Sequence, residues 1–138
     1  MERHYIIASH ESMADGISKT LKFIIGNQPN ITVLTAYVDN QPIEATVKKM
    51  FDKIPAGDEV IVFTDLLAGS VNQKFFPYTK REHTHIITGM NLPILMSLFM
   101  EPKDKYISAD RIRHLIKEAQ EQIQYVNDFS AEDDDDDE

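Results

Sequence analysis

The feature that most constrains the fold of this chain is the alternation of short apolar runs with longer segments of helical periodicity. Four runs, at residues 5–8, 31–37, 60–63 and 85–88, are too short for helices and are typical of strands. An amphipathic segment follows each run, and this order is typical of parallel strands joined by crossover helices. The sequence therefore predicts an α/β fold: a mostly parallel central sheet of four strands with helices on both faces.

Residues that favour helix ends mark the limits of these helical segments. Gly26 ends the first predicted helix, Pro42 opens the second, and Ser70, Asn91 and Ser108 are candidate N-caps for the following three. The buried faces predicted for the first and last helices consist of Met13, Ala14, Ile17, Leu21, Ile24 and Ile25, and of Ile112, Leu115, Ile116, Ala119 and Ile123. Beyond the last helix, residues 125–127 predict a short C-terminal strand.

Length and composition indicate one ordinary globular domain, expected over residues 1–130. The 138 residues suffice for a single hydrophobic core, and 42% of them are hydrophobic. The absence of cysteine excludes disulfides, thiolate metal sites and a thiol nucleophile. No apolar stretch resembles a signal peptide or a membrane span, so we expect a cytoplasmic protein without direct membrane insertion.

The net negative charge of the chain is concentrated near its C-terminus. Residues 132–138 are all acidic and account for seven of the nine net negative charges, which leaves −2 for the rest. A block of like charges repels itself and stays solvated, so we expect residues 131–138 to form a disordered tail. The remainder is not basic enough to predict a nucleic-acid partner.

Two residue types suited to group transfer follow neighbouring strands of the predicted sheet. His10 comes directly after the first run, and Asp65 follows the third. Ligands of open α/β sheets bind at the carboxyl ends of the strands, where these two residues would meet. A carboxylate bonded to one imidazole nitrogen fixes the tautomer and leaves the other nitrogen free to attack. His10 and Asp65 are therefore the candidate catalytic residues.

A third group of residues at this edge suits an anion. Gly69 and Ser70 lie at the predicted start of a helix, where backbone N–H groups attract negative charge, and the Ser70 hydroxyl is a further donor. With His10 and Asp65 they suit phosphoryl transfer, which needs mainly positioning and electrostatic stabilisation. The residues alone also leave open a domain that merely binds an anionic metabolite. Neither a GxxxxGK[ST] loop nor a GxGxxG fingerprint supports nucleotide binding.

The remaining histidines carry no strong signal, and no metal or other cofactor is expected. His83 and His85 alternate along the fourth run and would be able to share one face, but a position at the sheet edge without function is the simpler interpretation. His114 is expected on the solvated side of the last helix.

Three segments together resemble a known family. They read ASHESMADG at residues 8–16, DLLAGSVN at residues 65–72 and GMNLPIL at residues 89–95. In order and spacing they are similar to the motifs of the IIA domain of the mannose/fructose/sorbose-type sugar phosphotransferase system. The resemblance extends from residue 4 to about residue 128.

The resemblance implies a histidine phosphotransferase. His10 would accept a phosphoryl group from the phosphocarrier protein HPr and pass it to a IIB domain or protein. Asp65 would hold the imidazole, and the Gly69–Ser70 turn would cradle the phosphate. Members are usually homodimers in which the last strand, here residues 125–128, crosses to the sheet of the other subunit. The related phosphotransfer subunit of dihydroxyacetone kinase offers an alternative function.

The chain departs from the family pattern at three positions. Glu11 replaces the usual glycine after the histidine, Ala68 replaces the first glycine of a pair, and Val71 replaces a proline. A carboxylate at Glu11 would disfavour the phosphorylated state if it turned inward. The presence of Glu11 therefore favours a second alternative function. It is a regulatory binding module of the same fold that controls a partner without passing phosphate onward.

Overall fold

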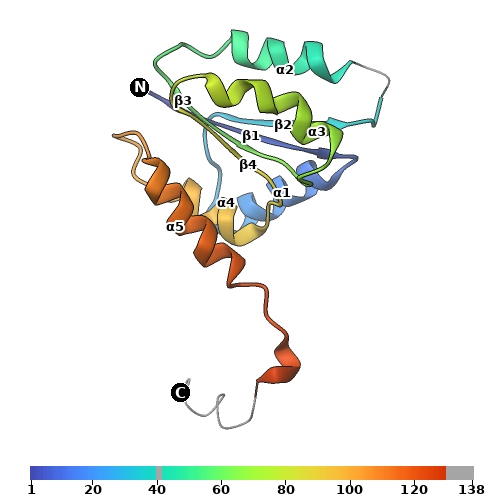
Figure 1. The fold of residues 1–138 in the computed structure, drawn as a ribbon, viewed down its shortest axis with the longest axis vertical. Helices are drawn as coiled ribbons and strands as arrows, with labels where there is room; N and C mark the ends of the chain where they lie inside the picture. The colour runs from blue at the N-terminus through green and yellow to red at the C-terminus, as the bar shows by residue number, and fades with distance from the viewer. Residues whose placement is uncertain (40–41, 130–138) are drawn as a thin grey trace.

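A computed structural model describes residues 1–39 and 42–129 and shows a four-stranded sheet in which every strand is parallel to its neighbours (Figure 1). The strands are β1 (Arg3–His10), β2 (Ile31–Ala36), β3 (Glu59–Phe63) and β4 (Thr84–Ile87). Their order across the sheet is β2-β1-β3-β4. The α/β class predicted from the alternating pattern is confirmed.

Helices cover both faces of this sheet. They are α1 (Met13–Ile25), α2 (Ile43–Asp52), α3 (Ser70–Phe75), α4 (Leu92–Phe99) and α5 (Ala109–Gln120), with short 3-10 helices η1 (Phe76–Lys80) and η2 (Val126–Asp128). In Figure 1, α2 and α3 lie on one side of the sheet, and α1, α4 and α5 lie on the other. No helix in the described part of the chain combines the length and the apolar character needed to cross a bilayer.

The two layers have separate hydrophobic cores, and β3 contributes to both. All five residues of β3 are buried. Val60 and Val62 pack into the cluster beneath α2 and α3, whereas Ile61 and Phe63 pack into the cluster beneath α1, α4 and α5. A continuous apolar run is typical of a parallel strand covered on both faces, so this central position agrees with the sequence of the run.

A buried ion pair joins the amino-terminal ends of β1 and β3. The Arg3 Nε and Glu59 Oε1 atoms lie 2.5 Å apart, and both side chains are fully buried. The Arg3 guanidinium also donates to the carbonyls of Glu101, Pro102 and Lys105, and the Ile107 N–H donates to Glu59 Oε2. The pair therefore fastens the segment before α5 to the sheet.

The C-terminal segment differs from the prediction. Residues 126–128 form η2 rather than a strand, and the segment leaves α5 and extends away from the domain (Figure 1). A strand needs a sheet edge to pair with, and among the described residues this segment meets none. Ile123 is 81% exposed because α5 ends at Gln120, before the predicted apolar face is complete. The predicted acidic tail, residues 131–138, lies outside the described residues.

The buried ion pair yields a prediction about stability. Replacing Glu59→Ala leaves the Arg3 guanidinium buried without its counter-charge, which should lower the free energy of unfolding by about 3–5 kcal/mol. Urea denaturation measures this loss. As a control, Asp52→Ala removes the exposed pair with Lys48, which solvent screens, and should change stability far less. Equal effects of the two substitutions would contradict the role assigned to the buried pair.

Candidate functional site

The structure brings His10 and Asp65 together at the carboxyl ends of β1 and β3. These strands are paired in register, with Ile7 opposite Phe63, so the residues that follow them emerge side by side. Asp65 Oδ2 accepts two hydrogen bonds from His10, one from the backbone N–H and one from ring Nδ1, each 2.8 Å long. Asp65 Oδ1 accepts a third from the Leu66 N–H at 3.0 Å. Hydrogen bonds to Asp65 thus fix both the backbone and the ring of His10.

The ionisation state of the Asp65 carboxyl group determines which nitrogen of the His10 ring carries the proton. Burial raises the pKa of Asp65, but the hydrogen bonds from the His10 backbone and ring outweigh burial and hold the pKa below its ordinary value. Asp65 is therefore a carboxylate that only accepts, so Nδ1 of His10 carries a proton. In the neutral imidazole Nε2 then keeps its lone pair, and the ring is 36% exposed. This arrangement suits a nucleophile.

The chain around His10 shows why a glycine is usual at position 11 of the resembling motif. Glu11 has a φ of +50°, and its N–H donates to the Ala36 carbonyl at 2.8 Å. Glycine adopts this left-handed conformation freely, whereas another residue meets a steric cost of about 1–2 kcal/mol. Glu11 is exposed to solvent, which screens its charge from the site. Glu11 thus holds a backbone conformation that a glycine would adopt without this cost.

The Gly69 turn approaches the imidazole directly. A Cβ atom at Gly69 would lie only 3.0 Å from Cε1 of His10 and 3.2 Å from the Leu66 carbonyl oxygen. Gly69 is also the N-cap of α3, so the prediction that Ser70 caps this helix was wrong. Ser70 is instead the first helical residue, and its hydroxyl is hydrogen-bonded to the phenol of Tyr37. Its side chain is therefore engaged within the site.

Tyr37 is the site residue that sequence reasoning missed. It follows β2, and its ring stacks on the imidazole of His10 with centroids 5.4 Å apart and planes inclined by 30°. The run 31–37 predicts a strand to its last residue, whereas β2 ends at Ala36. The available signal was its position, because the carboxyl end of β2 reaches the same sheet edge as His10.

The segment after β4 supports the site without supplying a reactive group. The Met90 N–H donates to the carbonyl of Thr64, the residue before Asp65, at 3.1 Å. Asn91 caps α4 as predicted, accepting from the Ile94 N–H at 2.9 Å, and its amide donates to the Ala119 carbonyl. The third resembling motif therefore anchors the Asp65 loop against α4 and α5.

Two of the other histidines have separate structural partners. His83 stacks on Tyr106 with ring centroids 3.6 Å apart, and His85 donates from Nε2 to the Ile107 carbonyl. They do not form a shared metal site.

Among the described residues, Glu2, His4 and Asp58 place one ligand atom each within 4.8 Å of one another. Both oxygens of Asp58 already accept hydrogen bonds, from the Glu2 N–H and from His4 Nε2. These contacts account for the cluster as a link between the starts of β1 and β3.

A mostly buried carboxylate holding a partly exposed imidazole at the carboxyl edge of a parallel sheet defines a class of small α/β domains with a candidate nucleophilic histidine. Comparison with known proteins narrows the class. Residues 4–116 match the family described as the PTS system fructose IIA component, and the chain belongs to this family of sugar phosphotransferase system components. The family carries phosphotransferase activity in general.

Solved structures agree with this assignment. A protein from Klebsiella pneumoniae, proposed to be a permease of a phosphoenolpyruvate-dependent sugar phosphotransferase system, is 39% identical, with a TM-score of 0.86 over 93% of each chain. The PTS IIA protein associated with the fucose utilization operon of Streptococcus pneumoniae is 26% identical, with a TM-score of 0.77 over 92% of this chain and 95% of that one. The mannose/sorbose-specific IIA subunit of Enterococcus faecalis, at 17% identity and a TM-score of 0.75 over 94% of this chain and 98% of that one, shares the fold.

The carboxylate of Asp65 yields a pH-dependent prediction. Asp65→Asn should lower the free energy of unfolding near neutral pH by about 1.5–3 kcal/mol, since charged hydrogen bonds are lost. Because folding lowers the pKa of Asp65, this stabilisation is complete above its unfolded pKa of about 4 and disappears as the pH falls through the lower folded value. The gap between the wild type and Asp65→Asn should therefore stay constant from neutral pH to about pH 5 and narrow as the pH is lowered further.

Denaturant titrations over this pH range measure the gap. The exposed Asp104→Asn substitution serves as the control and should show only a small gap at every pH. A gap for Asp65→Asn that is independent of pH would contradict the stabilising role of the ionised carboxylate.

Proposed function

We propose that this chain is a cytoplasmic phosphocarrier of a sugar phosphotransferase system. His10 accepts a phosphoryl group from the phosphocarrier HPr and passes it to a IIB domain or protein. The observation that carries the proposal is the Asp65–Nδ1 hydrogen bond, which in the neutral, partly exposed imidazole leaves the lone pair on Nε2. Membership of the IIA family supplies the class of donor and acceptor.

The proposed transfer balances without a cofactor. The Nε2 lone pair of His10 attacks phosphorus, the bond between phosphorus and the donor imidazole breaks, and that imidazole leaves with the electron pair. His10 keeps its Nδ1 proton and becomes a phosphorylated imidazolium. Asp65 faces this proton at 2.8 Å and stabilises the new positive charge. Transfer to the IIB partner reverses these roles.

Gly69 and Ser70 suit the incoming group. Because Gly69 has no side chain, the turn can lie against the Cε1 edge of the ring, next to Nε2. The Ser70 hydroxyl is a donor for a phosphoryl oxygen in the same turn. We assign both residues to phosphate binding.

The surface beside His10 suits a protein partner. Leu66 and Leu67, the two residues after Asp65, are 60% and 75% exposed. Exposed apolar side chains next to a reactive group are typical of protein-binding surfaces. Both the phosphoryl donor and the acceptor are expected to contact these leucines.

The proposal is tested by incubation with phosphoenolpyruvate, the general first enzyme of the system and HPr. The wild type should gain one acid-labile, base-stable phosphoryl group, measured by intact mass, and NMR should place it on Nε2 of His10. His10→Ala should gain none, while His114→Ala, which alters an exposed histidine of α5, should react normally. An adduct that persists in His10→Ala would overturn the assignment.

A second stage separates transport from regulation. Phosphorylated wild type mixed with a cognate IIB domain should lose the group to it. Retention of phosphate in the presence of that domain would instead support the regulatory alternative.

We also propose a homodimer formed through the C-terminal segment, as the family resemblance implies. Ile123, Tyr125, Val126 and Phe129 are each at least 50% exposed on a segment that extends from the domain. Apolar residues placed this way can add to the sheet of a second chain. We further propose, from the length and composition of the chain, that residues 1–130 form one domain.

Sedimentation equilibrium should therefore give a dimer for the full chain and for a chain ending at residue 129. A chain ending at residue 121 should be monomeric, because it lacks the exposed apolar segment. Equal masses for the two truncated chains would contradict the proposed interface.

A further inference from the structure

Tyr37 has a backbone conformation that its own preferences do not explain. Its φ of +68° lies in the left-handed region, and its side chain is half exposed. Such a conformation costs about 1–2 kcal/mol for a residue with a side chain and persists where the surroundings hold it. Strain of this kind is concentrated at functional sites, which makes the contacts of Tyr37 informative.

The register of the sheet places Tyr37 beside the reactive histidine. His10 pairs with Ala36, so the two strands end at the same level and Tyr37 is the first residue beyond β2. Its ring stacks on the imidazole, and its hydroxyl is bonded to that of Ser70. A Cβ atom at Gly69 would lie 3.0 Å from Cε1 of His10, so the turn that leads into Ser70 passes close to the ring carbon bonded to Nε2.

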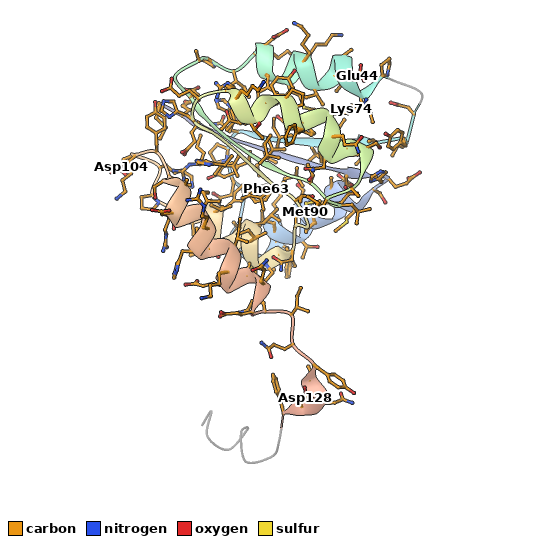
Figure 2. The ribbon with its side chains drawn as sticks, viewed as in Figure 1. Glu44, Phe63, Lys74, Met90, Asp104 and Asp128 are labelled. Carbon is orange, nitrogen blue, oxygen red and sulfur yellow. The ribbon has the colours of Figure 1, made fainter. Side chains whose placement is uncertain are left out.

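Tyr37 also borders a cavity. A cavity of about 330 Å³ is lined by Tyr37, Pro42, Ile43, Glu44 and Lys74. Figure 2 shows Glu44 on α2 and Lys74 on α3, and the two residues form a salt bridge of 2.5 Å. Tyr37 and this ion pair thus line the same cavity, and the phenol borders open space rather than the packed core.

We propose, on the basis of the phosphocarrier function above, that Tyr37 is a cap for the phosphorylated histidine. In the resting site the hydroxyls of Tyr37 and Ser70 bond to each other. When Nε2 carries a phosphoryl group, the pair separates and each hydroxyl donates to a phosphoryl oxygen, while the phenol ring shields the phosphorus from water. No covalent bond forms or breaks in this rearrangement.

The negative charge of the phosphoryl group favours replacing the hydrogen bond between Tyr37 and Ser70 with a bond from each hydroxyl to phosphate. In the resting pair only one of the two O–H groups donates to the other residue. A phosphoryl group accepts from both, and hydrogen bonds to an ionised acceptor are roughly twice as strong as neutral ones. Tyr37 therefore positions the phosphoryl group and lengthens its lifetime on His10.

The test measures the rate at which phosphate is lost from His10 by hydrolysis after HPr is removed. Tyr37→Phe deletes only the hydroxyl and should shorten the half-life about tenfold, the factor for one hydrogen bond of about 1.4 kcal/mol. Ser70→Ala should act similarly. Because the proposal assigns each hydroxyl its own bond to phosphate, the double variant should be shortened about a hundredfold.

A purely structural role gives a different pattern. If the two hydroxyls remained bonded to each other in the phosphorylated state, both single variants and the double variant would lose one shared bond. Equal half-lives for the three variants would therefore overturn the proposal, as would half-lives that match the wild type.

Tyr106→Phe is a matched control. Tyr106 also stacks on a histidine, His83, and its hydroxyl donates to the Gly57 carbonyl. This substitution should leave the half-life unchanged, and thermal unfolding should show that every variant is folded. Failure of the wild type to be phosphorylated at all would refute the phosphocarrier function itself, whereas normal phosphorylation with unchanged half-lives would refute only the cap.

Discussion

One carboxylate oxygen, Oδ2 of Asp65, accepts hydrogen bonds from both the backbone and the ring of His10, and the site depends on this double contact. The backbone bond links the ends of β1 and β3, and the ring bond selects the free nitrogen. The same carboxylate therefore holds two strand ends together and orients the reactive ring. The imidazole cannot turn without losing a charged hydrogen bond. Its geometry follows from the parallel pairing of two buried strands.

Two residues at the carboxyl edge of the sheet have strained backbones. Glu11 and Tyr37 follow the paired residues His10 and Ala36, and both have left-handed backbones. Other contacts must compensate for these conformations. At the opposite end of the sheet, the buried pair of Arg3 and Glu59 and its hydrogen bonds hold the same two central strands together. The amino-terminal end thus provides a rigid base for an edge that suits a reactive group.

Several local predictions failed for identifiable physical reasons. Ser70 has a favourable side chain for an N-cap, but Gly69 occupies that position because only glycine can approach the imidazole so closely. Asn91 and Ser108 cap their helices as predicted, since their partners lie three residues ahead in the sequence. The terminal strand is absent because a strand depends on a neighbour, and local periodicity does not reveal whether a second chain provides one.

The sequence by itself determined the fold class and the meeting of His10 with Asp65. The alternating pattern implies parallel strands, and parallel strands bring their carboxyl ends to one edge. Only the tertiary structure decided that Nε2 is the free nitrogen, that Tyr37 stacks on the imidazole, and that Arg3 and Glu59 are buried together. These features depend on side-chain directions and on contacts between residues far apart in the chain. Periodicity carries information about which face a residue occupies, but not about which distant side chain it meets there.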